Sequence, residues 1–394
     1  MTPPQSFALV FGAQFAAFGA MMPFLPAILA EGGLSASEVG AVLAAGSLVR
    51  LVAAPLSGRL ADAVPDMRRL LAVASLLAAA AALGFGLAAG FALLLAVQVL
   101  HSTAAAPIVP LSDALAVGAV RRGGFDYARV RSMGSITFML GALAAGLAAE
   151  WVGPRIAVWM LALGLLLTAW AALRLPAPPG REAGATPSTS IWAPLAEPGF
   201  LWVLPLAALI QGSHAVYYGF STLHWQAAGL STGFIGLLWA LGVLAEIVLF
   251  LWGRPVVERL GVRGLALLAA GAGVLRWAVT AVTVEPAVLV VVNLLHGLTF
   301  GAMHLSAMRA LVSLPAGLSG RAQTLLASAV SASTGGLMWG SGWLYGAVGG
   351  LAFLAMAGLC GLAFALALRR FPATPAARPG PAAPRSGTDH PSAA

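Results

Sequence analysis

The sequence predicts an all-α membrane protein in which twelve transmembrane helices form two pseudo-symmetric six-helix bundles. Three observations favour this fold class: the composition, the number of apolar runs and a repeat between the two halves of the chain. Of the 394 residues, 60% are hydrophobic and 9% are charged, and the mean hydropathy is +0.92. A water-soluble domain typically carries about 25% charged residues. The chain is therefore expected to cross a lipid bilayer many times.

Twelve apolar runs are long enough to span a hydrocarbon core about 30 Å thick. They cover residues 7–29, 36–58, 69–89, 91–118, 131–149, 155–173, 199–224, 233–253, 263–283, 286–308, 321–346 and 349–368. The arginines that flank these runs fall on alternate connections and at the C-terminal end, and only Arg155 falls on the other side. Because cytoplasmic loops carry the excess of positive charge, both termini are expected to be cytoplasmic.

The composition also excludes several kinds of site. The net charge of +8 comes from arginines in the gaps between apolar runs, not in one patch, so no nucleic-acid partner is expected. The single cysteine, Cys360, leaves no intrachain disulfide, and the sequence shows neither a metal-ligand spacing nor a cofactor motif. The N-terminal MTPPQSF lacks the positive region of a signal peptide, so the first apolar run is expected to remain as a helix.

The longest internal connection divides the chain into two domains. Residues 1–174 are the predicted N-terminal six-helix bundle and residues 199–370 the C-terminal one. The connection at 175–198 contains PAPPGREAGATPSTS, which is typical of a cytoplasmic linker. Residues 371–394 hold too few large apolar side chains to fold and are expected to form a disordered cytoplasmic tail.

A repeat relates the two halves. Residues 229–246 align with residues 33–50 and share the opening Gly-Leu-Ser and both spaced glycines. In this alignment Arg50 lies opposite Glu246, so each half places one charge at the same depth, roughly 20 Å into the membrane by helical rise. The segments 98–101 and 293–296 also match, and place a histidine near the middle of the membrane in each half.

Charged groups inside a membrane cost roughly 2.5–3.5 kcal/mol each on insertion scales, so they tend to face a cavity, to pair or to carry protons. Glu246 shares a helical stripe with Gly242 and Trp239, which favours a cavity lined by a carboxylate and an indole. The alternative is a purely structural ion pair. Arg50 is expected to bind a substrate carboxylate through two hydrogen bonds or to pair with an acid.

Further polar and aromatic side chains in the apolar runs are candidates for the same cavity. In a regular helix the polar positions of the tenth run fall on an arc of about 80°. The candidates are Asn293, His296, Phe300 and His304 in this run, His101 in the fourth run, and His214 and Tyr217 in the seventh. A histidine at neutral pH can share a proton or donate to a substrate oxygen. The alternative for each is a histidine whose hydrogen bonds are satisfied in the core.

The ends of the runs carry candidate gate residues. Asp113 lies near the cytoplasmic end of the fourth run, and Arg129 and Arg131 open the fifth. A gate or structural salt bridge is expected here, and contact with a ligand is the alternative. Glycines of the fifth and eleventh runs are expected to allow close helix packing: Gly134, Gly141, Gly146, Gly335, Gly336, Gly340 and Gly342.

A cytoplasmic loop resembles a known family. The segment Glu258-Arg-Leu-Gly-Val-Arg263 matches the acidic-Arg-x-Gly-x-Arg loop of the major facilitator superfamily, and Gly58-Arg-Leu-Ala-Asp62 resembles its first-half copy without the inner Arg-x-Gly. The resemblance implies that Asp62, Glu258, Arg259 and Arg263 hold one gate state by pairing with the neighbouring bundle. Retention of the loop in the cytoplasm by positive charge is the alternative.

Four longer segments, at 110–115, 127–135, 237–246 and 295–301, resemble the phenylpropionate permease group, which is similar to lactose and nucleoside proton symporters. The resemblance implies a monomer in the inner membrane that takes up a small organic solute, such as an aromatic acid, glycoside or nucleoside, together with protons by alternating access. It also implies that Glu246, Arg276 and His296 couple the proton, since they resemble the helix-eight acid, helix-nine arginine and helix-ten histidine of lactose permease.

Two features of the sequence bear on this proton site. Thr299 stands where lactose permease has a second acid, so the tenth run offers no replacement for Glu246. Arg276 reaches Glu246 only if both long side chains extend, and otherwise its guanidinium is expected to extend to the membrane surface.

Other function classes are less well supported. The sequence has no Gly-x-Ser-x-Gly, phosphate loop or catalytic domain outside the membrane, so an enzyme is not expected. A sensor related to transporters would carry a folded cytoplasmic extension. An exporter that exchanges a small organic compound for protons is the main alternative to uptake.

Overall fold

The computed structural model describes residues 1–120, 125–176, 190–315 and 318–369, in which the chain is helical and contains no strand. The side chains of residues 54, 55 and 57–63 also lie outside this description. Most of the predicted linker, the predicted tail and the side chain of the gate candidate Asp62 are therefore not described, and the domain boundaries stay predictions.

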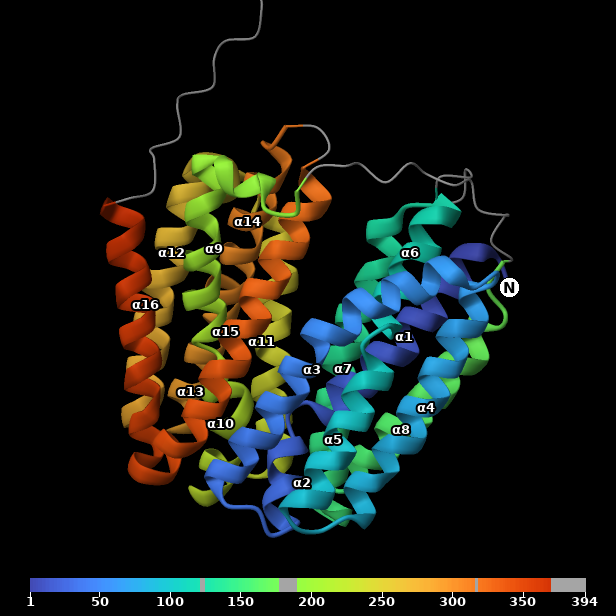
Figure 1. Ribbon diagram of the computed structural model, residues 1–394. Coiled ribbons are helices and arrows are strands. Elements are labelled where there is room, and N and C mark those ends of the chain that lie inside the picture. Colours follow the sequence, from blue (N-terminus) through green and yellow to red (C-terminus); the bar gives the residue numbers. More distant parts are fainter. Residues whose placement is uncertain (121–124, 177–189, 316–317, 370–394) are drawn as a thin grey trace, which may run out of the picture.

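The helices of residues 3–172 gather on one side of the molecule, blue to green in Figure 1, and form what we call the N-terminal half. They are α1 (Pro3–Met21), α2 (Leu25–Glu31), α3 (Ala36–Ala63), α4 (Met67–Leu87), α5 (Phe91–Ala105), α6 (Ile108–Val120), α7 (Tyr127–Val152) and α8 (Ile156–Ala172).

The remaining helices gather on the other side, lime to red, and form the C-terminal half. They are the 3-10 turn η1 (Ala193–Ala196), α9 (Pro198–Gly212), α10 (Ala215–Ala227), α11 (Thr232–Trp252), α12 (Arg254–Val282), α13 (Pro286–Leu294), the π-helical η2 (Gly297–Ala302), α14 (Met303–Val312), α15 (Ser319–Val348), the 3-10 turn η3 (Gly349–Leu351) and α16 (Ala352–Arg369).

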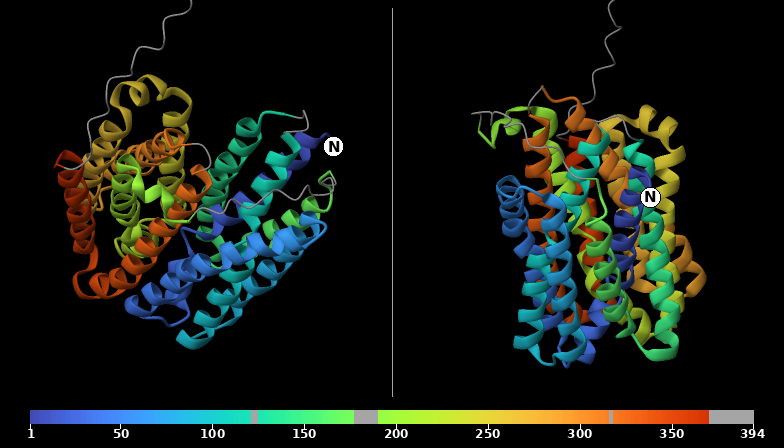
Figure 2. Two further views of the ribbon diagram at one scale, coloured as in Figure 1. Left: turned by 45° about the horizontal axis from the view of Figure 1, so that its top comes forward. Right: turned by 90° about the vertical axis from the view of Figure 1, so that its right-hand side faces the viewer.

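The two halves converge at one end of the molecule and diverge at the other. The ribbons meet where α2 and α10 lie, and they stand apart at the end that holds the N-terminus and the end of α16 (Figures 1 and 2). At the converging end, Thr222 Oγ1 donates to Pro23 O at 2.6 Å, and Gly233 N donates to Glu150 Oε1 at 3.0 Å. Both hydrogen bonds join the halves.

Nine helical stretches of the described residues are long and apolar enough to cross a membrane. The pair α1–α2, bent by 46°, makes a tenth if it counts as one span. The shorter α8 is apolar over 17 residues, and one stretch, Ser319–Arg369, contains both α15 and α16. The chain is thus a multi-pass membrane protein, and the number twelve stays a prediction.

Four of the described stretches are interrupted near their middles. The breaks separate α1 from α2, α5 from α6, α9 from α10, and α13 from α14. Pro107 follows the end of α5 and has no N–H to continue the helical ladder. At the end of α9, Ser213 Oγ donates to Ile210 O at 2.6 Å and thereby competes with the backbone bonds. Such breaks free backbone and polar groups at membrane depth, which is tolerated only inside the protein.

The predicted ninth run at 263–283 corresponds to the part of α12 that follows a kink, although α12 itself begins at Arg254. Gly261 interrupts it with φ 60° and ψ −170°, a conformation that favours glycine. The loop motif is therefore a short helical segment that turns sharply into the span.

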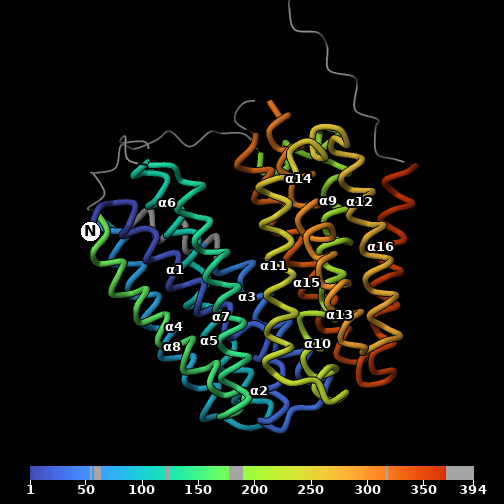
Figure 3. Tube along the Cα trace, turned by 180° about the vertical axis from the view of Figure 1, so that it is seen from behind, coloured from blue at the N-terminus to red at the C-terminus, as the bar shows by residue number. Residues whose placement is uncertain are grey.

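Glycines let helices of opposite halves approach closely, α7 against α11 and α3 against α15 (Figure 3). A Cβ atom on Gly146 would lie 2.6 Å from Thr232 O, and one on Gly342 would lie 2.7 Å from Ala36 O. The predicted close packing is confirmed at these glycines and at Gly134, Gly141 and Gly335. It is wrong for Gly336 and Gly340, which have no neighbour within 4 Å of a Cβ atom because they lie on another face of α15.

Candidate functional site

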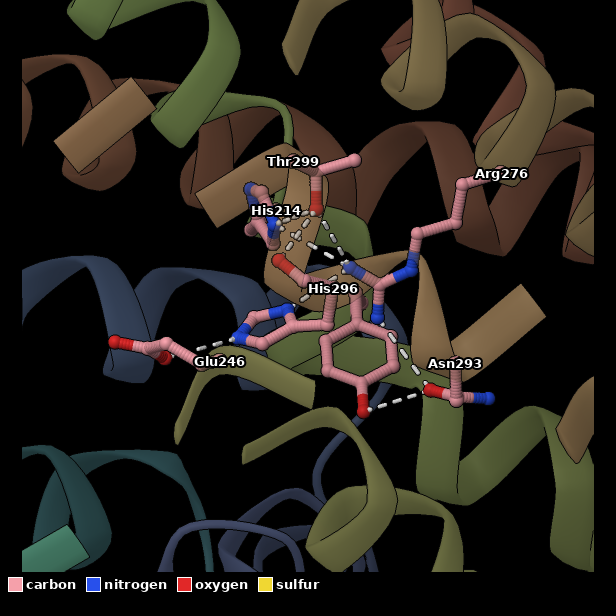
Figure 4. A network of polar contacts seen from close by, with 7 residues as sticks. His214, Glu246, Arg276, Asn293, His296 and Thr299 are labelled. Carbon is pink, nitrogen blue, oxygen red and sulfur yellow. Dashed lines mark hydrogen bonds and ion pairs between the residues drawn. The ribbon is translucent and has the colours of Figure 1, made fainter. Parts of the chain in front are cut away.

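Several predicted site residues of the C-terminal half meet around a buried guanidinium, that of Arg276 on α12 (Figure 4). They are His214, Tyr217, Asn293 and His296. The side chain of Arg276 is 1% exposed. Its NH1 group lies 2.9 Å from His296 Nδ1, 3.2 Å from Thr299 Oγ1 and 3.4 Å from His214 Nε2. Its NH2 group donates to Asn293 Oδ1 at 3.4 Å. Among the described residues, Arg276 therefore has neutral hydrogen-bond acceptors and no carboxylate in contact.

Aromatic rings close the remaining sides of this guanidinium. Arg276 Cζ lies 4.6 Å from the centroid of Tyr217 and 4.4 Å from that of Trp277. Tyr217 also donates its hydroxyl to Asn293 Oδ1 at 3.1 Å. Ring faces attract cations by their quadrupole, so the aromatic side chains partly replace the missing counter-ion. The guanidinium of Arg276 is therefore buried in the protein and does not extend to the membrane surface, which was the alternative expectation.

The hydrogen bonds assign the tautomers of both histidines. Because His296 Nδ1 accepts from Arg276, the ring is neutral and its proton is on Nε2. His214 donates from Nδ1 to Ile210 O at 3.1 Å, so its Nε2 is the acceptor nitrogen that faces Arg276 and Thr299. Either ring can take a second proton only by giving up its bond to the guanidinium.

Glu246 lies on the far side of His296 from Arg276. The Nε2 atom of His296 is 4.0 Å from Glu246 Oε2, which exceeds a hydrogen bond. Gly242, one turn before Glu246, leaves room for the ring, since a Cβ atom there would lie 3.2 Å from His296 Cβ. The expected direct contact between Arg276 and Glu246 is therefore absent from the described contacts, and an imidazole stands between the two charges.

Glu246 and His296 open onto a cavity of about 320 Å³ between the halves. The C-terminal half contributes a wall of aromatic rings, in which Tyr217 and Trp239 lie 4.7 Å apart and Phe300 stacks on His296 at 5.4 Å. The N-terminal half contributes Arg131 and Phe138 from α7. Trp239 Nε1 is buried without a hydrogen-bond partner in the described structure, so a donor is available beside the cavity.

A second cavity of about 420 Å³ lies in the N-terminal half and holds the other two predicted groups, Arg50 and His101. Phe15, Met22 and Phe138 line both cavities, so the two spaces adjoin. His101 Nδ1 lies 3.0 Å from Ala78 O and donates to it, which fixes the ring against α4.

The predicted Asp113–Arg131 salt bridge is present. Arg131 Nε lies 3.5 Å from Asp113 Oδ1, which also accepts from the hydroxyl of Tyr127 at 2.8 Å. The guanidinium of Arg131 lies over Phe15 at 4.2 Å. All four residues belong to the N-terminal half, so the pair joins α6 to α7 and does not cross the gap. Arg129 is exposed and lies outside both cavities.

The loop charges around α12 pair within their own half. Glu258 accepts from Arg254 at 2.7 Å, one helical turn away. Arg263 donates to Ala367 O and Leu368 O at the end of α16, at 3.1 and 2.7 Å, and Arg259 is exposed. In the described residues none of these charges reaches the N-terminal half, so the expected pairing with the neighbouring bundle is absent from this conformation because the halves diverge here. Their gate role stays a prediction.

The π-helical η2 changes the predicted polar face of the tenth run. A π segment inserts an extra residue in the turn and rotates all that follows. Asn293 therefore still contacts Arg276, and His296 and Phe300 still line the cavity between the halves. His304 instead packs against Phe250, with 6.0 Å between the ring centroids. Three further polar residues contribute to the site and were not predicted as site residues: Thr299 accepts from Arg276, Gln98 lines the cavity of the N-terminal half, and Ser213 accepts from Trp277. The available signal was a polar residue within an apolar run. The described residues contain no group of three His, Cys, Asp or Glu side chains placed to hold a metal.

Comparison with known proteins is consistent with this architecture. Residues 6–355 match the model of the "MFS_1 like family". The chain is 33% identical over 309 residues to the probable 3-phenylpropionic acid transporter of Escherichia coli (strain K12), covering 77% of this chain and 80% of that protein. It is 30% identical over 275 residues to the maltose permease of Geobacillus stearothermophilus, 69% of each.

A solved structure of the nucleoside transporter NupG superposes with a TM-score of 0.83 at 14% identity, covering 94% of this chain and all of that one. A solved peptide transporter POT, bound to alafosfalin, gives 0.71 at 16% identity, covering 93% and 95%. These structures share the fold. The matched family and relatives are transporters and not enzymes, as the sequence predicted.

Proposed function

Because the chain belongs to the MFS_1 like family of the major facilitator superfamily, we propose that it is a proton-coupled symporter that takes up a small organic solute by alternating access. One observation carries the proposal: the only carboxylate that lines the two described cavities, Glu246, is linked through His296 to the buried Arg276. The cavity that Glu246 lines is formed by the two halves of a single chain, so a monomer is sufficient.

The proton cycle follows from the groups that face Glu246. Arg131 on α7 and the N–H of His296 both favour its ionised form, while Trp239 and Tyr218 exclude water and favour its neutral form. Movement of one half changes the distance to Arg131, which belongs to the other half. Glu246 thereby binds a proton in one orientation of the carrier and releases it in the other. Arg276 stays on the C-terminal half and polarises His296 throughout.

We extend the proposal to the membrane topology. Twelve spans result if α1–α2 and α8 each cross the bilayer and α15 and α16 cross separately. Counted in this way, spans one, four, seven and ten are those interrupted near their middles. The interruption recurs every third span, which supports an architecture of repeated three-helix units. The inner membrane, with both termini and the diverging end in the cytoplasm, is the proposed location.

The test reconstitutes the full chain in liposomes and compares two modes of transport. Counterflow exchange of a radiolabelled solute requires binding and reorientation, whereas accumulation driven by a pH gradient also requires coupling. The Glu246→Gln variant keeps the size of the side chain and mimics its protonated form. We expect exchange within about threefold of the wild type and at least a tenfold loss of pH-driven accumulation.

The matched control is Glu285→Gln, which removes an exposed carboxylate next to α13 and should leave both modes unchanged. Accumulation by Glu246→Gln at the wild-type rate, with its pH dependence intact, would show that another group couples the proton. Asp113 would then be the next candidate.

A further inference from the structure

The guanidinium of Arg50 differs from the other two near the centre of the molecule. Arg131 already has Asp113 at 3.5 Å, and Arg276 is enclosed by four neutral acceptors and is 1% exposed. Arg50 is exposed and lines the cavity of the N-terminal half, and the described structure gives it neither a hydrogen bond nor an ion pair. Neither Asp nor Glu is among the residues that line this cavity.

A second polar group lines the same cavity. Gln98 on α5 is 3% exposed, and its Oε1 atom is buried without a partner in the described structure. Leaving such a group unpaired costs about 1–3 kcal/mol. A carboxamide both donates and accepts: its Nε2 group can donate to a ligand carboxylate near Arg50, whereas its Oε1 atom needs a donor that a carboxylate does not supply. Ser102, one turn further along α5, adds a hydroxyl to the same wall.

The rest of the joined space is apolar. Phe15, Met22 and Phe138 lie where the two cavities meet, and Tyr217, Trp239 and Phe300 line the far end. The volumes, about 420 and 320 Å³, are within the range of small-molecule sites. The space therefore has a cationic, hydrogen-bonding end in one half and an aromatic wall in the other.

We propose that Arg50 and Gln98 bind the carboxylate of an organic acid, that its apolar part lies against the shared aromatic wall, and that its uptake with one proton on Glu246 moves no net charge. This inference rests on the proposed proton symport and names the class of its substrate. A guanidinium binds a carboxylate through two parallel hydrogen bonds, which orients the acid as well as neutralising it.

The charge balance follows from the central groups. Arg131 cancels Asp113, and His214 and His296 are neutral by their hydrogen bonds. Arg50, Arg276 and an ionised Glu246 then leave one net positive charge in the empty carrier. Protonation of Glu246 adds one positive charge and the bound anion removes it, so the loaded carrier has the same charge. A neutral solute would leave the loaded carrier one unit more positive, and exchange of acid for proton would make the two states differ by two units.

The first test measures selectivity. Full-length protein in liposomes is given radiolabelled 3-phenylpropionate as the probe, and 3-phenylpropionamide is the neutral competitor; protein-free liposomes correct for passive entry. The wild type should prefer the acid over the amide by at least tenfold in counterflow. Arg50→Gln should reduce this preference below threefold, and Arg50→Lys should give an intermediate value because it keeps the charge without the paired geometry.

The matched control is Arg254→Gln, since that arginine is exposed and pairs only with Glu258 in the described structure. If Arg50→Gln does not fold, Gln98→Leu tests the same end of the cavity. It should weaken the binding of the acid by at least threefold without weakening the binding of the amide. Unchanged preference in a folded variant of either residue overturns the subsite.

The second test clamps the membrane potential with potassium and valinomycin at a fixed pH gradient. Accumulation of the acid should change less than twofold between 0 and −100 mV, inside negative. One net charge per cycle would change it by about 50-fold, and this result would overturn the charge balance. Absence of pH-driven accumulation of any acid or neutral solute would instead defeat the proposed symport. Accumulation of amide and acid alike would leave the symport standing and defeat the carboxylate site.

Discussion

At the scale of single residues, the unusual feature is a buried guanidinium that is satisfied without a carboxylate. Arg276 holds two histidines neutral through the hydrogen bonds that they accept. A buried charge without partners is costly, and the acceptors together with the rings of Tyr217 and Trp277 offset that cost. The arrangement leaves His296 as the single bridge between Arg276 and Glu246, which makes this ring the most informative residue to change.

His296→Gln should distinguish the role of His296 as a link between Arg276 and Glu246 from its role as an acceptor for the guanidinium. A glutamine oxygen can accept from Arg276 in place of Nδ1, so counterflow exchange should stay within about threefold of the wild type. With its oxygen in the place of Nδ1, the amide does not place an N–H where Nε2 of His296 faces Glu246, so pH-driven accumulation should fall at least tenfold. His296→Leu leaves the guanidinium short of an acceptor, which costs about 1–3 kcal/mol, so its melting temperature should fall while that of the Gln variant does not. Full accumulation by the Gln variant would remove His296 from the coupling pathway.

At the scale of helices, two glycine crossings set how closely the halves approach. Gly146 of α7 faces the backbone of α11, where Thr232 O and Gly236 Cα would lie 2.6 and 3.0 Å from an added Cβ atom. Backbone atoms cannot rotate away as a side chain does. The same helix pair carries the hydrogen bond from Gly233 N to Glu150 Oε1. Contact between α7 and α11 therefore depends on the absence of a side chain at Gly146.

Gly146→Val should separate the halves at their converging end. Spin labels at Ala89 and Ala228, both exposed and on opposite halves, would report the change as a longer distance population in a Cys360→Ser background. Gly336→Val is the control, because nothing lies within 4 Å of a Cβ atom there. An unchanged distance distribution in the Gly146 variant would mean that the crossing relaxes without opening the end.

At the scale of the whole molecule, both described chain ends lie at the diverging end, and α2 lies at the opposite one (Figure 1). Arg155 pairs with Glu31, the last residue of α2, at 3.4 Å. The bias of arginine in the sequence predicts that the diverging end faces the cytoplasm. In this conformation the cavities would then communicate with the cytoplasmic side, and the inter-half hydrogen bonds of Thr222 and Glu150 would close the periplasmic side.

Cysteine accessibility checks this orientation. In a Cys360→Ser background, Ser190→Cys should react with an impermeant thiol reagent only after the membrane is opened, because Ser190 lies in the connection between the halves. Ala228→Cys, at the end of α10, should react in intact cells. The opposite pattern of labelling would reverse the topology and, with it, the direction of the proposed uptake.

The sequence by itself determined the membrane-protein class, the approximate limits of the helices and the identity of the buried charges. These features are local: an apolar run of sufficient length must enter lipid, and its ends follow the flanking arginines, glycines and prolines. Glu246, Arg276 and Arg50 were visible for the same reason, since a charge within such a run has to be compensated. Asp113 and Arg131 were recognisable as a pair because a short connection joins their helices.

The tertiary structure alone decided which of these groups meet. The imidazole between Glu246 and Arg276, the unpaired Arg50 beside Gln98, and the attachment of Arg263 to the end of α16 all involve helices that are distant in the chain. Their contacts depend on the rotation and crossing of whole helices. The π turn after His296 rotates the rest of its span away from the face that a regular helix would present. A pattern read along one helix cannot contain that information, because the energy that fixes it comes from packing against the others.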